Sequence, residues 1–277
     1  MSGNYRAQYD SRPAAAMRTG AHVTDLFVTT TGRGPNIVLL HGWGLHSSVW
    51  DGVHARLASR WRITCIDLPG HGQSSAGLDL RALDAVCAQL HEAISDRVIC
   101  VGWSLGGLIA TSYALRYPQS VRRLILVASQ PRFTRTSNWP HALSASMLRR
   151  FGETLKRDHQ TALTRFLALQ VQASDNRQST LRRLHAVVNA HSPNHAALYA
   201  GLELLRETDL RARLSKVACP ARMILGARDK LVPVKSGGVV AALFKNGRCA
   251  IIPGAGHAPF LSHPLAFMRA LETFLDD

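Results

Sequence analysis

The most regular feature of the chain is an alternation between short, continuously apolar runs and longer segments with a helical period. The apolar runs are strand-like and occupy residues 36–40, 62–67, 97–102, 121–127, 221–226 and 248–252. Continuous apolar strands that alternate with helices are typical of a parallel sheet covered on both faces. We therefore predict an α/β fold with a mostly parallel, doubly wound sheet, in which ligands bind at the carboxyl ends of the strands.

The alternation stops between residues 131 and 215, where no strand-like run occurs. The helical patterns of this segment include residues 147–156, 162–171 and 180–189. We interpret the segment 131–215 as an all-helical lid inserted into a core formed by residues 21–130 and 216–277. Residues 1–20 have no hydrophobic period, and we expect them to form a disordered N-terminal extension.

The composition is that of a globular protein. Of the 277 residues, 46% are hydrophobic and 18% are charged, which provides enough apolar material for a sizeable core. No apolar run reaches the roughly 18 residues of a membrane span, and the N-terminus lacks the pattern of a secretory signal. The five cysteines show no metal-ligand spacing, so we expect buried free thiols in a reducing cytoplasm. We expect neither a metal nor a cofactor, and no membrane partner.

A serine flanked by glycines is the candidate nucleophile. The string Gly102-Trp103-Ser104-Leu105-Gly106 follows a strand-like run and precedes a helical segment. The glycines allow a tight strand-to-helix turn from which the Ser104 hydroxyl projects, and the helix N-terminus favours negative charge. Such a string is common by chance, but its position between a strand and a helix makes it specific.

A nucleophilic serine requires a base, and the base requires an acid that orients it. Asp229 follows the run 221–226, and His257 follows the run 248–252. The order Ser, Asp, His is the order in which such residues follow one another on sheets of this kind. Either residue alone would be interpreted as an ordinary loop residue, but together with Ser104 they predict a catalytic triad.

Two backbone N–H groups are needed to bind the oxyanion that forms during attack on a carbonyl. We expect one from Leu105, directly after the nucleophile. The other is expected from Trp43, in the loop His41-Gly42-Trp43-Gly44 that follows the first strand-like run. The Trp43 ring would also form a wall of the acyl site, while His41 would brace the loop.

These motifs resemble those of the α/β-hydrolase superfamily over nearly the whole chain. Within it, the chain is similar to the biotin-synthesis carboxylesterases that act on the methyl ester of pimeloyl-[acyl-carrier protein]. The strings that carry the resemblance are LLHGWGL (39–45), DLPGHG (67–72), GWSLGG (102–107), RFLALQ (165–170), GLELL (201–205), TDLR (208–211), HAPF (257–260) and SHP (262–264).

The resemblance implies a serine carboxylesterase that frees the terminal carboxylate of the carrier-bound pimeloyl chain in biotin precursor synthesis. By position, the residues that would contact the substrate are Trp43, Ser104, Leu105, Phe166, Leu167, Ala168, Leu169, Gln170 and His257. No cofactor or metal is implied. We expect a monomer whose partner is the acyl-carrier protein.

Basic residues of the lid would face this acidic carrier. The formal charge is +15, and the stretch from Arg132 to Arg183 holds nine Arg and one Lys against three acidic residues. A cationic lid would steer an acidic partner towards the site. The candidate docking residues are Arg149, Arg150, Arg165, Arg177 and Arg182. The pattern departs from the family at Thr161, where a basic residue is expected, and the arginines after Gln170 are shifted by about one position.

Other functions remain open at this point. A general short-chain carboxylesterase, a lipase or a carbon–carbon bond hydrolase would use the same triad, and substrate scope would separate them. A ligand-binding homologue with vestigial turnover is disfavoured because all three triad residues are present. Nucleic-acid binding is disfavoured because no recognition motif accompanies the positive charge. The arginines of the lid could also be a solvated helix surface in an arginine-rich proteome.

Overall fold

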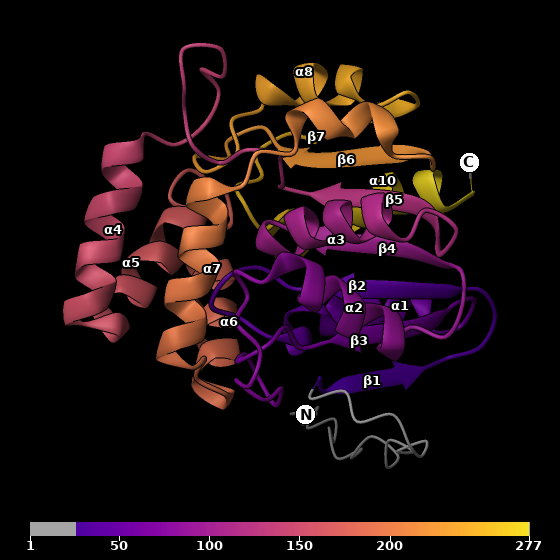
Figure 1. The fold of residues 1–277 in the computed structure, drawn as a ribbon, viewed down its shortest axis with the longest axis horizontal. Coiled ribbons are helices and arrows are strands. Elements are labelled where there is room, and N and C mark those ends of the chain that lie inside the picture. The colour runs from indigo at the N-terminus through magenta and orange to yellow at the C-terminus, as the bar shows by residue number, and fades with distance from the viewer. Residues whose placement is uncertain (1–25, 277) are drawn as a thin grey trace, which may run out of the picture.

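The computed structural model describes residues 26–276, so the predicted N-terminal extension lies outside the described part of the chain. A seven-stranded sheet forms the centre, helices cover both of its faces, and a group of helices forms a lid at one end (Figure 1). The strands are β1 (Val28–Thr31), β2 (Asn36–Leu40), β3 (Arg62–Ile66), β4 (Val98–Trp103), β5 (Val121–Val127), β6 (Ala221–Gly226) and β7 (Gly247–Ile252).

The sheet has the spatial order β1-β3-β2-β4-β5-β6-β7 and is parallel except at one edge. Strands β2 to β7 coincide with the predicted apolar runs, which confirms the mostly parallel sheet. Strand β1 was not predicted, and it pairs antiparallel with β3, with Val28 opposite Ile66. Its sequence VTTT is mostly polar because this edge strand is only partly buried.

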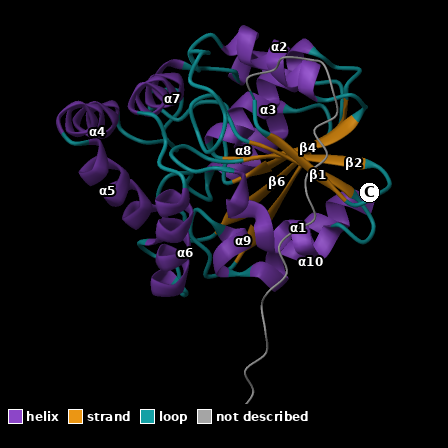
Figure 2. Cartoon of the chain, turned by 90° about the horizontal axis from the view of Figure 1, so that it is seen from below, coloured by secondary structure: helices purple, strands orange, loops and turns teal. Residues whose placement is uncertain are grey.

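Helices on both faces explain why the central strands are apolar at every position. Every residue of β2, β4 and β6 is buried. Helices α2 (Leu83–Ala93), α3 (Leu105–Arg116) and α8 (Ser236–Leu243) lie on one side of the sheet, as Figure 2 shows. Helices α1 (Asp51–Leu57), α9 (Pro259–Ser262) and α10 (Pro264–Asp276) lie on the other.

The lid lies between β5 and β6 in the chain and consists mainly of helices. These are α4 (Ala145–Arg157), α5 (His159–Val171), α6 (Arg177–Ala190) and α7 (His195–Glu207). Side chains cap three of these helix starts: Ser144 accepts the Met147 N–H, Asp158 accepts the Thr161 N–H, and Asn194 accepts the Ala196 N–H. The chain enters the lid through residues 132–143, which form two isolated β-bridges, and leaves it through the 3-10 helix η2 (Arg211–Lys216).

None of the helices within residues 26–276 combines the length and apolar character needed to cross a membrane. The same residues contain no group of three or more His, Cys, Asp or Glu side chains arranged to hold a metal ion.

Candidate active site

Ser104 occupies the sharp turn between β4 and α3. Its backbone angles are φ 54° and ψ −116°, a region that non-glycine residues rarely adopt and that holds the side chain away from the strand. The turn requires its glycines, because a Cβ on Gly106 would lie 2.5 Å from the Leu40 and His41 carbonyl oxygens. A Cβ on Gly102 would lie 2.3 Å from the Gly106 oxygen. The sequence motif is therefore a packing requirement of the turn.

The structure brings the three predicted triad residues into one hydrogen-bonded chain. Ser104 Oγ lies 2.9 Å from His257 Nε2, and His257 Nδ1 lies 2.8 Å from Asp229 Oδ2. The other carboxylate oxygen, Asp229 Oδ1, accepts the N–H groups of Leu231 and Val232 at 2.8 and 3.0 Å. The side chains of His257 and Asp229 are fully buried. Asp229 is thus fixed by the backbone and can hold the imidazole with Nδ1 protonated and Nε2 free to accept the serine proton.

Residues outside the triad hold His257 in place through its backbone. The His257 N–H donates to the Gln170 carbonyl at 3.0 Å, and the Trp103 indole N–H donates to the His257 carbonyl at 2.7 Å. The Ser129 hydroxyl similarly donates to the Ser104 carbonyl at 2.7 Å. Sequence reasoning did not identify Trp103 and Ser129 as supports. The available signal was weak: Trp103 lies next to Ser104 in the motif, and Ser129 lies two residues after the end of β5.

The two N–H groups expected to bind the oxyanion are available. The Leu105 N–H is at the first position of α3, and neither it nor the Trp43 N–H has an acceptor among the described residues. The Trp43 side chain is fixed separately, because its indole N–H donates to the Leu198 carbonyl at 2.8 Å. Its ring packs edge-on against Phe166, with the ring centroids 4.8 Å apart.

Two buried histidines support the loop that carries Trp43. The Leu68 N–H donates to His41 Nε2 at 2.9 Å, so His41 donates from Nδ1 to the Gly42 carbonyl at 2.8 Å. The Gly44 N–H donates to His71 Nε2 at 3.3 Å, and His71 Nδ1 donates to the Pro69 carbonyl at 3.0 Å. Burial, aided by their mutual repulsion when charged, lowers the pKa of His41 to about 3, and burial lowers that of His71 to about 4. Both rings are therefore neutral supports of the loop.

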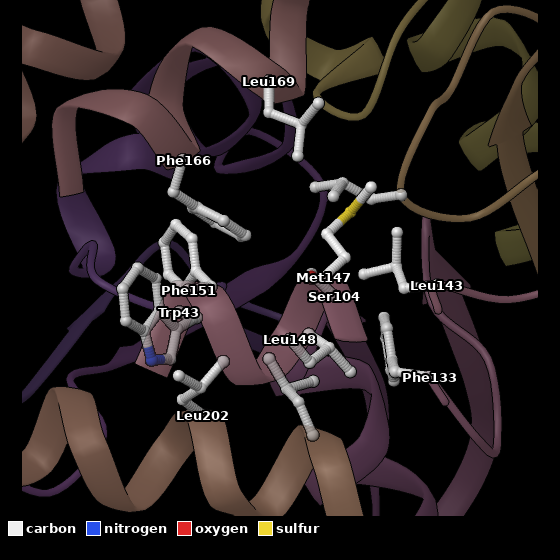
Figure 3. A pocket seen from close by; sticks show the side chains of 12 residues that line it. Trp43, Ser104, Phe133, Leu143, Met147, Leu148, Phe151, Phe166, Leu169 and Leu202 are labelled. Atoms are coloured by element: carbon white, nitrogen blue, oxygen red, sulfur yellow. The ribbon is translucent and has the colours of Figure 1, made fainter. Parts of the chain in front are cut away.

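The Ser104 side chain borders a cavity between the core and the lid (Figure 3). Apart from Ser104, its lining is apolar and comprises Trp43, Phe133, Leu143, Met147, Leu148, Phe151, Phe166, Leu169, Leu202, Leu205 and Leu231. In this view Trp43, Phe151 and Phe166 gather on one side, and Phe133 and Leu143 lie on the other. Such a cavity can hold an acyl chain and present its ester carbonyl to Ser104.

Of the five residues of α5 that were expected to contact the substrate, only two line the cavity in the described structure. Phe166 and Leu169 line the cavity, whereas Leu167, Ala168 and Gln170 are not among the lining residues. Leu167 is buried in the lid core, and the Gln170 amide is buried without a hydrogen-bond partner in the described chain. Leu105 also does not line the cavity.

Several lining residues were missed because the sequence does not show which face of a helix meets a cavity. Two of them, Phe133 and Leu143, come from residues 132–143, through which the chain enters the lid. Three others, Met147, Leu148 and Phe151, come from α4. The helical period at 147–156 indicated an apolar face, but it could not distinguish packing on the core from packing on a cavity.

The five candidate docking arginines lie on three helices of the lid and are all exposed. Arg149 and Arg150 belong to α4, Arg165 to α5, and Arg177 and Arg182 to α6. None of them forms an ion pair with another described residue. Their positive charge is therefore free to act on a partner in solution.

Comparison with known proteins identifies relatives along almost the whole chain. Residues 35–264 match the family model described as the alpha/beta hydrolase fold. A pimeloyl-[acyl-carrier protein] methyl ester esterase from Nitrosomonas europaea is 39% identical over 90% of this chain and 99% of its own. One from Edwardsiella ictaluri is 44% identical over 91% of this chain and 97% of its own.

Solved structures with lower sequence identity share the same fold. An esterase from Exiguobacterium antarcticum superimposes with a TM-score of 0.84 at 23% identity, covering 91% of this chain and 96% of its own. An enol-lactonase from Burkholderia xenovorans LB400 gives a TM-score of 0.79 at 20% identity, with 91% of this chain and 96% of its own covered.

Proposed function

The chain belongs to the alpha/beta hydrolase fold family and, within it, to the pimeloyl-[acyl-carrier protein] methyl ester esterases, and we propose that it hydrolyses the methyl ester of a pimeloyl chain held by acyl-carrier protein. It is a carboxylic ester hydrolase whose reaction belongs to biotin synthesis. The single observation that carries the proposal is the Ser104 hydroxyl, 2.9 Å from His257 Nε2, at the wall of an apolar cavity.

The cavity suits the neutral ester better than the product. Its lining offers methylene groups apolar contacts worth about 0.8 kcal/mol for each buried methylene. Within residues 26–276, no cationic side chain lines it to stabilise a carboxylate. Hydrolysis converts the buried ester into an acid that ionises at neutral pH, and burial of an uncompensated charge is unfavourable. The same apolar lining therefore favours substrate entry and product release.

The proposed reaction proceeds in two halves through an acyl-enzyme. His257 accepts the Ser104 proton as Ser104 Oγ attacks the ester carbonyl, and the N–H groups of Trp43 and Leu105 stabilise the resulting oxyanion. When the intermediate collapses, His257 gives the proton to the departing methoxide, which leaves as methanol. A water molecule then attacks the acyl-enzyme with His257 again as the base, and this step releases the carboxylate and regenerates Ser104. Asp229 holds the imidazole and stabilises its charged form throughout.

The exposed lid arginines support the acidic carrier as the partner. Arg149, Arg150 and Arg165 lie on α4 and α5, the helices that also supply Met147 and Leu169 to the cavity lining. A carrier that docks on these helices can deliver its acyl chain into the cavity. Attraction between the cationic lid and the acidic carrier would raise the association rate and weaken as salt screens it.

The nucleophile is tested with a serine-directed fluorophosphonate and by mass spectrometry. We expect one label on the intact protein, located on Ser104, and none on the Ser104→Ala variant. That variant should keep its circular dichroism spectrum and lose hydrolysis of methyl pimeloyl-acyl-carrier protein. Labelling elsewhere, or full activity of Ser104→Ala, would remove the assignment.

Docking is tested with a charge reversal at the lid. Arg165→Glu should raise the KM for the carrier-bound ester and leave hydrolysis of a small soluble ester unchanged. Arg56→Glu, an exposed position of α1 on the core, is the matched control because it changes the net charge equally. Equal effects of the two variants on the carrier-bound ester would contradict docking on the lid.

A further inference from the structure

The loop that leads into the lid forms part of the cavity wall and is held in shape by hydrogen bonds between its own backbone groups. We call residues 132–143 the strap. Across the strap, the Leu143 N–H donates to the Phe133 carbonyl at 3.0 Å, and the Arg135 N–H donates to the Leu143 carbonyl at 2.7 Å. Phe133 and Leu143 are therefore neighbours, and both side chains line the cavity (Figure 3).

The tip of the strap is closed by a second pair of backbone bonds. Thr136 and Trp139 exchange N–H to carbonyl bonds of 3.2 and 3.0 Å. The Trp139 side chain folds back under the strap, where it is buried, and its indole N–H donates to the Arg132 carbonyl at 3.0 Å. The strap thus has a fixed shape, although it belongs to no helix or sheet strand.

Arg211, at the start of η2, joins this strap to the segment that follows α7. Its Nε and Nη2 donate to the two carboxylate oxygens of Asp209 at 2.9 and 2.8 Å. Its Nη1 donates to the carbonyl and side-chain oxygens of Asn138 at 3.3 and 3.1 Å. The guanidinium also lies over the Trp139 ring, 5.3 Å from the centroid. The Arg211 guanidinium therefore contacts the strap tip in two ways: its N–H groups donate to Asn138, and its planar face lies over the Trp139 ring.

A second arginine holds the base of the strap to the same carboxylate. Arg132 Nη1 donates to Asp209 Oδ2 at 2.6 Å, and Arg132 Nε donates to the Thr134 carbonyl at 2.9 Å. The hydrogen bonds from Arg211, followed by those from Arg132, hold the pKa of the Asp209 carboxyl well below its usual range. The side chains of Arg211, Arg132 and Asp209 are 20, 21 and 29% exposed, so water screens this cluster less than an ordinary surface pair.

We propose that Arg211 is a positioning residue which, through Asp209 and the strap, places Phe133 and Leu143 against the acyl chain and thereby sets the chain length that the esterase accepts. This inference rests on the proposed function, because it concerns the acyl chain of that same site. It also gives a role to the motif Thr208-Asp209-Leu210-Arg211, which takes no part in the chemistry at Ser104.

The position of the strap makes it important for longer chains in particular. Met147 lines the cavity and is 41% exposed, so it marks the side on which the cavity meets solvent. Leu143 is half-buried and lies beside Met147 in Figure 3. A longer chain that runs from Ser104 towards Met147 lies along this part of the wall, whereas an acetyl group offers one methyl group for such contacts.

The proposal is tested with p-nitrophenyl esters of two to eight acyl carbons. In Arg211→Ala, we expect the preference for the eight-carbon over the two-carbon ester in kcat/KM to fall by about fourfold for each methylene group that loses its wall contact. The loss should reside in KM, and kcat for the two-carbon ester should be unchanged. Arg213→Ala is the matched control, because Arg213 is exposed on the same η2 helix and its side chain forms no hydrogen bond or ion pair with another described residue. Arg211→Lys keeps the charge but loses the planar fork, and its chain-length profile should resemble that of Arg211→Ala.

A double-mutant cycle separates positioning of the strap from loss of fold. Leu143→Ala removes part of the wall directly, so Arg211→Ala should have little further effect on the chain-length ratio in that background. Additive effects, or an unchanged ratio in Arg211→Ala and Arg211→Lys, would overturn the proposal. Failure of the proposed function would differ, because the unaltered protein would then hydrolyse the free esters but not methyl pimeloyl-acyl-carrier protein.

Discussion

Acidification should destabilise the fold through His41 and His71, the buried histidines that support the loop carrying Trp43. Burial lowers the pKa of His71 to about 4, from an ordinary value of 6.5. In the unfolded chain His71 therefore becomes protonated near pH 6.5, whereas in the folded chain it stays neutral until the pH approaches 4. The stability due to the neutral ring is fully present above pH 6.5 and is lost as the pH falls from 6.5 towards 4.

The size of the effect follows from the two pKa values. Between pH 7.5 and 5.5, one such histidine should lower the free energy of unfolding by about 1.4 kcal/mol. The fully buried His41, with a pKa of about 3, adds a similar amount over this interval. The structural cause is specific: a proton on His71 Nε2 would face the Gly44 N–H that now donates to it.

The assay is urea unfolding at both pH values for the unaltered protein, His71→Gln and His159→Gln. In His71→Gln the difference between the two pH values should shrink by about 1.4 kcal/mol, because the titrating ring is gone. His159 is exposed at the start of α5, so its replacement serves as the matched control. Equal pH differences in the unaltered protein and in His71→Gln would refute the reasoning.

Three substitutions test the site itself. Asp229→Asn should reduce kcat on a p-nitrophenyl ester by about 10⁴ with the fold retained, because the imidazole loses the partner that fixes its tautomer; a kcat near that of the unaltered protein would contradict this role. Gly201→Ala would place a Cβ 2.8 Å from Trp43 Cδ1 and push the ring into the cavity, so the KM for long esters should rise, and an unchanged KM would show that the ring is not a wall. Trp103→Phe leaves the His257 carbonyl without its donor, and urea unfolding should show a loss of about 1–3 kcal/mol, together with a lower kcat; unchanged stability and rate would exclude this support.

The fold was largely predictable because its central strands are apolar on both faces. The predicted runs 36–40 and 97–102 overlap β2 and β4, and every residue of these two strands is buried, so a strand is the natural interpretation of their continuous apolar pattern. Strand β1 was missed because a short, half-exposed edge strand with three threonines has no such run. The order of the strands in the sheet also does not follow from periodicity.

The chemical part of the site was predictable for a related reason. Ser104, Asp229 and His257 each follow directly after a strand, and parallel strands bring their carboxyl ends to one edge of the sheet. The cavity was less predictable, because Phe133 and Leu143 depend on a strap whose shape comes from hydrogen bonds to distant residues. The link from Arg211 to Asn138 spans 73 positions of the chain, and no local pattern indicates it.

Comparing a carrier-bound with a free ester tests the central claim most directly. The kcat/KM for methyl pimeloyl-acyl-carrier protein should greatly exceed that for a short p-nitrophenyl ester at low ionic strength. The advantage should shrink as salt screens the lid arginines, while the rate on the free ester stays constant. A preference for the free ester, or a carrier preference that does not respond to salt, would contradict an esterase that recognises its substrate through a cationic lid.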